Sequence, residues 1–283
     1  MEEKAKPLPV TVCVPVKNEA RNITECLSCL GKNFAKVVVV DSGSDDGTQE
    51  AARAEGAEVL QFEWNGQFPK KRNWFLHNHR PETEWVLFLD ADERVTPSFI
   101  QELRETLAET SHAGFWIPFH NWFMGRRLKH GDPFLKLALF RVSAGEYERF
   151  DEDWWSHLDM EVHEHPVLEG TEGTLNSPLE HHEFHGLHRY ISKHNEYSTW
   201  EAKRWQWFQE QGEEAWSQLT PRQRTKYQNL DKAWLAWAYF LASYVAKKGF
   251  LDGKAGFVFA SLKRRYFSDI RRKILEAERS KAG

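Results

Sequence analysis

Short apolar runs alternate with amphipathic segments over the first third of the chain. The runs are rich in β-branched residues and have the length of strands buried on both faces of a parallel sheet. They occupy residues 10–16, 36–41, 58–62 and 86–89. The segments between them have helical spacing and occupy residues 22–30, 48–55 and 68–78. This β-α alternation predicts a doubly wound α/β sheet, and Asn22 is predicted to cap the first helix.

The pattern changes further along the chain. Thr96 followed by Pro97 predicts the start of a helix that runs to about Glu109. Two more strands are expected at residues 114–119 and 137–141, and mainly helical structure from His188 onwards. We therefore expect a soft boundary near residue 190, with helices beyond it.

Polar side chains follow three of the predicted strands. Asn18 and Glu19 come after the first strand, Asp41 ends the second, and Asp90 and Asp92 follow the fourth. Ligands of open α/β sheets bind beyond the carboxyl ends of the strands. Two carboxylates this close repel each other unless a cation lies between them, and a hard divalent ion suits them best. A solvated acidic turn would explain a lone D-x-D, but three polar strand ends together predict a ligand site.

Composition and charge narrow the class of protein. The net charge of -4 gives no basic field for nucleic acid. Cys26 and Cys29 form a C-x-x-C without a second pair, which favours free thiols over a zinc or redox site. Residues 1–9 lack the apolar core of a signal peptide, and no apolar run reaches the ~18–20 residues of a membrane-spanning helix. These features favour a protein of the cytoplasm.

Three segments together, residues 14–19, 39–48 and 89–94, resemble the inverting family 2 glycosyltransferases of GT-A fold. Four later motifs are similar to those of the bacterial lipopolysaccharide-core glucosyltransferases of the WaaE/KdtX type. They are L-F-R at 139–141, V-H-E at 162–164, N-x-Y-S at 195–198 and G-F-L-D-G at 249–253. Residues 132–136 depart from the aromatic-rich pattern of those relatives, which puts the acceptor in doubt rather than the chemistry.

The resemblance implies a nucleotide-sugar donor, most simply a UDP-sugar, and Mg²⁺ or Mn²⁺ as cofactor. It places the metal on Asp92 and the general base on Glu164, with Asp159 and Glu161 as alternatives for the base. Acceptor contacts are expected from His163, Arg141 and His182. The expected donor-binding residues are Pro15, Val16, Asn18, Glu19, Asp41, Ser42, Gly43, Lys71, Arg72, Asp90 and Ala91.

The resemblance also implies that the chain is divided into three parts with different functions. Residues 1–115 would form the nucleotide-sugar-binding half of a GT-A domain, residues 116–190 its acceptor-binding half, and residues 191–283 a helical extension. An apolar aromatic segment at 233–246 followed by a basic helix suits the surface of an anionic bilayer. We therefore expect peripheral attachment to the inner face of a bacterial cytoplasmic membrane. The acceptor would be a glycan or a lipid-linked glycan of cell-envelope or lipopolysaccharide synthesis.

Other functions stay open at this point. His182, His185 and His188 have the spacing of a metal-binding helix face, although the H-E-x-x-H signature is absent. The alternative is therefore a nucleotide-sugar-binding or zinc-binding protein without transferase activity. A nucleotidyltransferase is disfavoured, because the loop after the first strand contains no glycine.

Overall fold

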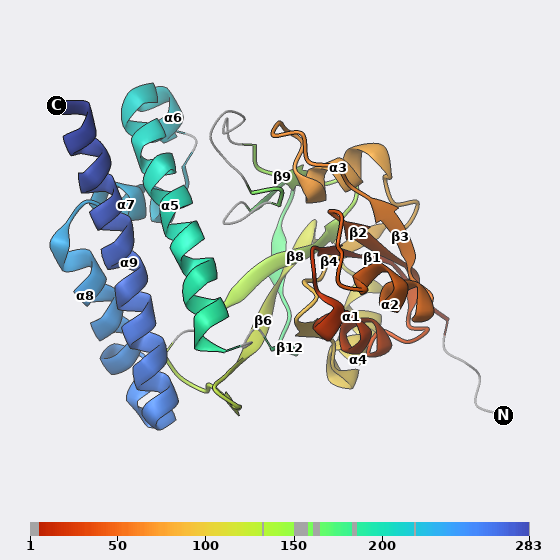
Figure 1. The fold of residues 1–283 in the computed structure, drawn as a ribbon. Coiled ribbons are helices and arrows are strands. Elements are labelled where there is room, and N and C mark those ends of the chain that lie inside the picture. Colours follow the sequence, from red (N-terminus) through yellow and green to blue (C-terminus); the bar gives the residue numbers. More distant parts are fainter. Residues whose placement is uncertain are drawn as a thin grey trace. The chain divides into compact units, whose positions relative to one another are not determined.

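A computed structural model describes residues 6–131, 133–149, 158–160, 165–182, 186–217 and 219–282. The chain forms two compact units, and each is described here by itself (Figure 1). The first unit comprises residues 1–121 and 134–183, and the second comprises residues 122–133 and 184–283. The first unit is therefore built from two separate stretches of chain.

The first unit contains a mixed, mostly parallel sheet in the order β3-β2-β1-β4-β8-β6-β12-β5. Strands β3, β2, β1 and β4 are parallel, β8 runs antiparallel to β4 and β6, and β12 is parallel to β6. The main strands are β1 (Leu8–Val16), β2 (Phe34–Asp41), β3 (Glu58–Gln61), β4 (Trp85–Phe88), β6 (Gly114–Phe123) and β8 (Leu135–Arg141). The short strands are β5 (Glu93–Arg94), β9 (Gly145–Tyr147), β10 (Pro166–Leu168), β11 (Glu172–Thr174) and β12 (Leu179–His181).

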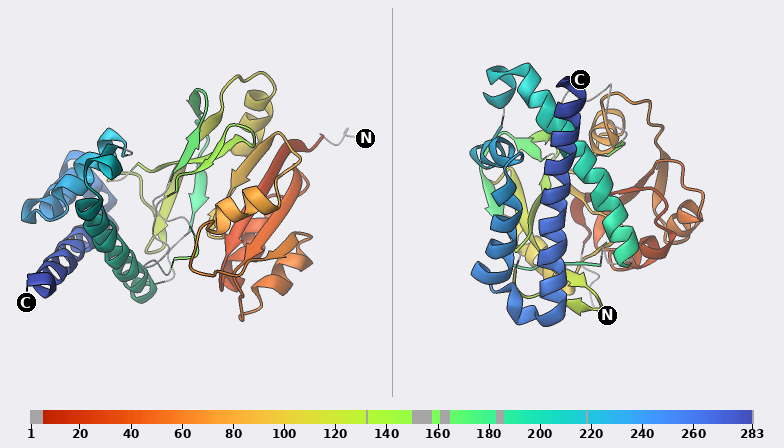
Figure 2. Two further views of the ribbon diagram at one scale, coloured as in Figure 1. Left: turned by 90° about the horizontal axis from the view of Figure 1, so that it is seen from above. Right: turned by 60° about the vertical axis from the view of Figure 1, so that its left-hand side comes forward.

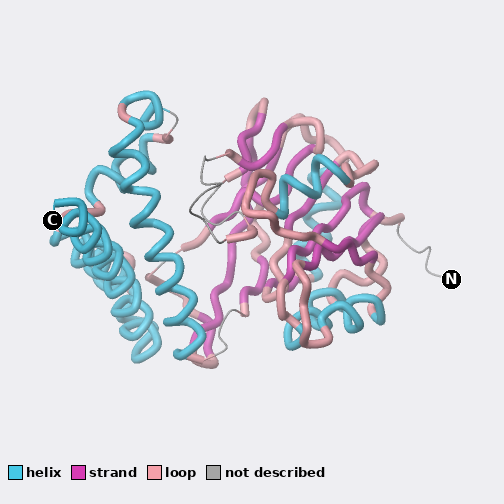
Figure 3. Tube along the Cα trace, turned by 45° about the horizontal axis from the view of Figure 1, so that its top comes forward, coloured by secondary structure: helices cyan, strands magenta, loops and turns pink. Residues whose placement is uncertain are grey.

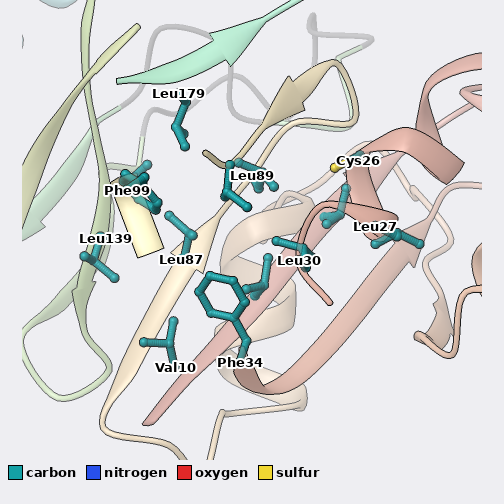
Figure 4. Packing of buried hydrophobic residues seen from close by; sticks show 14 of the residues in the cluster. Val10, Cys26, Leu27, Leu30, Phe34, Leu87, Leu89, Phe99, Leu139 and Leu179 are labelled. Carbon is teal, nitrogen blue, oxygen red and sulfur yellow. The ribbon is translucent and has the colours of Figure 1, made fainter. Parts of the chain in front are cut away.

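Strand β4 shows why the sheet is buried on both faces. Leu87 belongs to the hydrophobic cluster on one face, together with Phe99 and residues of the first helix. Val86 and Phe88 belong to the cluster on the other face. Alternate side chains of a strand point to opposite faces, so an unbroken apolar run fills two cores at once. Figure 4 shows part of the first core, in which Leu87 and Leu89 lie near Leu30 and Phe99.

The helices of the first unit match the predicted ones in type and order. They are α1 (Ala20–Ser28), α2 (Thr48–Ala54), α3 (Lys71–Asn78) and α4 (Pro97–Leu107). Thr96 caps α4 by accepting a hydrogen bond from the Phe99 N–H, as predicted. The prediction for Asn22 is wrong, because α1 begins at Ala20 and Asn22 lies inside it. The predicted α/β architecture is confirmed.

The second unit is helical, and the predicted helical C-terminal region is confirmed (Figures 2 and 3). Helices α5 and α8 both pack against α9. The elements are β7 (Arg126–Arg127), α5 (Leu187–Gln211), α6 (Glu213–Ser217), α7 (Pro221–Asn229), α8 (Ala233–Leu241), the π-helix η1 (Ala242–Ala246), the 3₁₀-helix η2 (Gly249–Asp252) and α9 (Gly253–Ala282). None of the described helices is both long and apolar enough to cross a bilayer.

The G-F-L-D-G motif ties two distant segments of the second unit together. The Asp252 carboxylate is buried and accepts hydrogen bonds from the N–H groups of Lys129 and His130. Gly131 has a φ of +88° and lies so close to Gly249 that a Cβ would come within 3.3 Å of the Gly249 Cα. Gly249 and Asp252 of the motif, together with Gly131, therefore fix the segment that leads from β6 to β8.

Candidate active site

The loops after β1 and β2 are bound to each other at the carboxyl edge of the sheet. The N–H of Asn18 donates to Ser44 Oγ at 2.8 Å, and Asn18 Oδ1 accepts from the Asp45 N–H at 3.0 Å. The N–H of Glu19 donates to Thr48 Oγ1 at 2.8 Å. Asn18 has a φ of +56°, a conformation that asparagine adopts more readily than most residues. Two of the predicted donor-binding positions therefore lie in one rigid double loop.

Asp41 organises the second of these loops. Its carboxylate is buried and accepts hydrogen bonds from the N–H groups of Gly43 and Ser44, at 3.0 and 2.9 Å. The Ser44 hydroxyl and the Gln49 amide also donate to it. Four donors compensate the loss of water around this charge. Ser42 lies next to it, and its N–H donates to the carbonyl oxygen of Val16 at 3.1 Å.

The first carboxylate of the D-x-D is neutralised by the protein. Asp90 Oδ1 lies 2.8 Å from Arg72, and Asp90 Oδ2 lies 2.7 Å from Lys136 Nζ. Burial would raise the pKa of Asp90, but the charges of Lys136 and Arg72 outweigh it and hold that pKa well below its usual range. Asp90 is therefore an ionised anchor for two cations from other elements.

Lys136 also reaches a third carboxylate of the same segment. Its Nζ lies 3.1 Å from Glu93 Oε1, while Glu93 Oε2 accepts the Asp90 N–H at 2.8 Å. Burial raises the pKa of Glu93, and the charge of Lys136 opposes that rise only in part. The sequence analysis missed Lys136 and Glu93 as site residues. Glu93 had a signal, since it follows the D-x-D directly, but Lys136 lies in a strand more than forty residues away.

The second carboxylate of the D-x-D has a different partner. Asp92 Oδ1 lies 3.6 Å from His181 Nε2, and the other ring nitrogen of His181 lies 3.0 Å from Asn121 Oδ1. If that nitrogen donates to the amide oxygen, Nε2 presents its lone pair toward Asp92. Within the described residues, no three His, Cys, Asp or Glu side chains form a metal-binding group. Among the described residues at this edge of the sheet, the Asp92 carboxylate and the His181 imidazole lie side by side and could bind a cation together.

Lys71 and Arg72 are both buried and both engaged with the protein. Lys71 Nζ donates to the carbonyl oxygen of Val16 at 2.9 Å and lies 3.2 Å from Asp159 Oδ2. Burial lowers the pKa of Lys71, while the charge of Lys71 holds the pKa of Asp159 below its usual range in spite of burial. Contact of these cations with a diphosphate stays a prediction, and their observed partners do not favour it.

Of the predicted acceptor-binding residues, the structure describes only Arg141 and His182. Glu161, His163 and Glu164 lie outside the described residues. Arg141 pairs with Trp85, at the end of β4 opposite to Asp90. There it donates to the carbonyl oxygens of Thr110 and His112, at 2.7 and 2.9 Å, and forms an ion pair with Glu84. These contacts give Arg141 a structural role in the first unit, and its acceptor role stays a prediction.

His182 lies beside the D-x-D but contacts it through the backbone. Its N–H donates to the carbonyl oxygen of Asp92 at 2.8 Å, and burial lowers the pKa of its ring. His182 follows β12, which ends at His181, and His188 lies in α5, which begins at Leu187, so these two histidines do not lie on one helix. His185 itself lies outside the described residues.

The remaining motifs are explained by packing. Lys273 Nζ donates to Asn195 Oδ1 at 2.8 Å and to Ser198 Oγ at 2.8 Å, so the N-x-Y-S motif joins α5 to α9 within the second unit. Cys26 is buried and Cys29 half-buried, and neither forms a disulfide. Cys26 Sγ lies 3.7 Å from the carbonyl oxygen of Asp90, directly below the D-x-D.

Known proteins resemble this chain over different lengths. It is 27% identical over 204 residues to the lipopolysaccharide core biosynthesis glycosyltransferase LpsC of Rhizobium meliloti, a match that covers 69% of this chain and 71% of LpsC. It is 31% identical over 108 residues to a TPR repeat-containing protein of Synechococcus elongatus. That second match covers 38% of this chain, and the chain spans only 26% of the Synechococcus protein.

Among solved structures, a mannosyltransferase from Pyrobaculum calidifontis in complex with GDP-Man and Mn²⁺ aligns over 96% of this chain and 90% of its own. The identity is 16% and the TM-score is 0.49. The family model described as glycosyl transferase family 2 matches residues 11–161, which is more than half of the chain and includes the ends of β1, β2 and β4. The chain therefore belongs to glycosyl transferase family 2.

Proposed function

We propose that this chain is a GT-A glycosyltransferase that moves a sugar from a nucleotide-sugar donor, a UDP-sugar, to an acceptor with inversion at the anomeric carbon. Family membership supports a transferase. The observation that carries the rest is the arrangement of the D-x-D: Asp90 is held by Arg72 and Lys136, while Asp92 lies beside the imidazole of His181 at the same edge of the sheet. Asp90 would fix the segment, and Asp92 with His181 would act on the ligand.

The donor set fits a divalent cation. A carboxylate oxygen of Asp92 and Nε2 of His181 would hold Mg²⁺ or Mn²⁺, which take their remaining ligands from water and from substrate phosphates. Asn121 would orient the imidazole from behind, as partners of metal-bound histidines commonly do. When bound, such an ion would supply positive charge that stabilises the leaving diphosphate.

Removal of the acceptor proton requires a carboxylate with a suitable pKa. Asp159 is a poor candidate, because its contact with Lys71 holds its pKa low and a weak base gains little from proton transfer. This favours Glu164 of the V-H-E motif, the base implied by the family resemblance. The acceptor half of the reaction therefore depends on residues 161–164.

We further propose a glycan or lipid-linked acceptor of cell-envelope or lipopolysaccharide synthesis, with the protein bound peripherally to the inner face of a bacterial cytoplasmic membrane. The similarity to LpsC, whose name refers to lipopolysaccharide core biosynthesis, supports this acceptor class. The apolar and basic character of residues 233–273 supports contact with an anionic bilayer.

The test separates donor binding from transfer. Thermal unfolding would be followed with UDP, GDP, CDP and dTDP, with and without Mn²⁺, since a ligand that binds the folded state raises its stability. We expect a Mn²⁺-dependent shift with UDP in the wild type and in Glu164→Gln, and no such shift in Asp92→Ala. Transfer by Glu164→Gln should fall by about 100- to 10,000-fold.

Glu55→Ala, which removes an exposed carboxylate at the end of α2, is the matched control and should behave as the wild type. An undiminished UDP shift in Asp92→Ala would refute the metal assignment. Wild-type turnover by Glu164→Gln would refute the base. No shift with any nucleotide would leave a protein without transferase activity as the better explanation.

A further inference from the structure

Helix α8 and the π-helix η1 expose a row of large apolar side chains. Trp234, Trp237, Leu241 and Val245 are 55%, 54%, 54% and 54% exposed. Their spacing of three, four and four residues places them on one side of a continuous helical segment. Leu235 and Ala236, on the other side, are buried in the second unit. The segment therefore buries one side and presents an equally apolar side outward.

The exposed row continues onto the following elements. Phe250 and Leu251 of η2 and Phe257 of α9 are 48%, 53% and 49% exposed. The ring of Tyr244 connects them, with its centroid 6.3 Å from that of Phe250 and 5.6 Å from that of Phe257. We define the apolar face as Trp234, Trp237, Leu241, Val245, Phe250, Leu251 and Phe257.

This clustering is unusual for a solvated surface. Eleven large hydrophobic side chains are exposed among the described residues, and the apolar face contributes seven of them from a single short segment. Single exposed apolar residues need no explanation, whereas a contiguous patch marks an interaction site.

Within residues 232–268, the stretch of chain that carries the apolar face, the charged residues are almost all basic. Between residues 232 and 268 the only acidic residue is Asp252, which is buried and bound to the N–H groups of Lys129 and His130. The same stretch contains seven basic residues, namely Lys232, Lys247, Lys248, Lys254, Lys263, Arg264 and Arg265. Lys247, Lys248 and Lys254 are exposed. The guanidinium of Arg264 lies 4.3 Å from the ring centroid of Trp237.

We propose that the apolar face docks on the surface of an anionic lipid bilayer, with Lys247 and Lys248 between η1 and η2, and Lys254 of early α9, against the phosphate headgroups. Tryptophan and phenylalanine rings partition into the boundary between acyl chains and headgroups. The basic residues match the negative surface of the lipid, which a neutral apolar partner would not require. The described helices are too short or too polar to span, so the segment lies in the interface plane.

This proposal deepens the proposed function, on which it rests for its biological setting, by naming the surface that would bring the enzyme to a lipid-linked acceptor. The contact with the membrane does not depend on the catalytic reaction. Vesicle binding requires neither donor nor metal, so its failure and the failure of the nucleotide experiment can be told apart.

The test is flotation of the full chain with vesicles of phosphatidylcholine alone and with vesicles containing an equal part of phosphatidylglycerol. We expect the wild type to float with the anionic vesicles and to remain largely soluble with the neutral ones. Trp237→Ser/Leu241→Ser should weaken binding by about tenfold or more, given the apolar area that both side chains would bury. Both positions are half exposed, so the fold should tolerate the change.

Two matched controls test whether the position of the substituted side chains matters, and not only the loss of apolar or basic side chains. Val167→Ser/Leu187→Ser removes exposed apolar side chains elsewhere and should float as the wild type. Lys247→Glu/Lys248→Glu should lose binding to the anionic vesicles, whereas Lys32→Glu/Arg222→Glu, also at exposed positions, should keep it.

Two outcomes would overturn the proposal. One is a wild type that stays in the soluble fraction with anionic vesicles at low salt. The other is a concentration-dependent dimer that Trp237→Ser/Leu241→Ser abolishes while vesicle binding stays absent, because a second copy of the chain would then be the occupant of the apolar face.

Discussion

Lys136 lets two carboxylates of one short segment stay close together without an external cation. Its ammonium lies between Asp90 and Glu93, and Arg72 shares the charge of Asp90 from the other side. The cations of Lys136 and Arg72 contact Asp90, and Lys136 also contacts Glu93, in one largely buried cluster, so the D-x-D keeps its geometry before any ligand arrives. Preorganisation of this kind spares a reacting site the cost of rearranging during the reaction.

Removing this cation should destabilise the first unit. We expect Lys136→Met to lower the free energy of unfolding by about 2–4 kcal/mol at neutral pH, because a buried ion pair that loses one partner leaves an uncompensated charge. The pKa of Asp90 is held low in the folded state, so this stabilisation is complete above the unfolded pKa of about 4 and is lost as pH falls further. Denaturant unfolding of wild type and variant at pH 7 and at about pH 2 to 3, below the unfolded pKa, measures the difference.

Two comparisons make this result specific. Lys136→Arg retains the charge and should recover most of the stability, and Lys32→Met removes an exposed lysine and should change it by less than about 0.5 kcal/mol. A difference between Lys136→Met and wild type that stays constant or grows on acidification would contradict the electrostatic explanation.

The acidic residues of the site could be predicted from sequence, whereas their partners could not. Asp41, Asp90 and Asp92 directly follow apolar runs, so the end of each strand marks them. Lys136 and His181 lie in strands that join the sheet from far along the chain. Their closeness to the D-x-D follows from the strand order β4-β8-β6-β12-β5, which no local pattern encodes.

Helix α1 illustrates the same limit for secondary structure. Periodicity predicts where α1 lies in the chain, but it does not predict the first residue of the helix. The free N–H groups at its start donate to Thr48 Oγ1 and Asp46 Oδ2, side chains from the loop after β2. Local capping rules consider only acceptors at the helix's own N-terminus, and they therefore predict Asn22 as the capping residue. Here the cap is supplied by tertiary structure, which also binds the two site loops to each other.

The Asp252 carboxylate is the corresponding long-range connection in the second unit. Asp252→Ala leaves the N–H groups of Lys129 and His130 without their acceptor, at a total cost of about 1–3 kcal/mol, because both hydrogen bonds are partly buried. We expect amide hydrogen exchange at Lys129 and His130 to become faster by at least about tenfold, with a lower midpoint of thermal unfolding. Unchanged exchange at both amides would show that the hydrogen bonds contribute little.

Asp231→Ala is the matched control for that experiment. Asp231 forms an exposed ion pair with the adjacent Lys232, and such pairs contribute little. Its backbone carbonyl still accepts from Arg271 Nε at 3.0 Å in the variant, so the local chain path is kept.

The two candidate binding surfaces of the molecule lie in different units. The polar strand ends all belong to the first unit, and the apolar face belongs to the second. The first unit is discontinuous, because residues 122–133 leave it to join the helices and residues 134–183 return. A sequence read in order predicts a single boundary near residue 190, since only tertiary contacts reveal such an excursion. The predicted functional division into residues 1–115, 116–190 and 191–283 stays a prediction.

If the two surfaces act separately, two ligands should protect two different parts of the chain from hydrogen exchange. UDP with Mn²⁺ should slow exchange in peptides from residues 16–20, 41–48 and 90–94 and leave residues 234–257 unchanged. Anionic vesicles should slow exchange in residues 234–257 and leave the strand-end loops unchanged. Asp92→Ala should lose only the first effect and Trp237→Ser/Leu241→Ser only the second, because each change removes the contact of one ligand. Loss of both effects in either variant would contradict independent surfaces and would indicate that the membrane-facing helices and the donor site respond to each other.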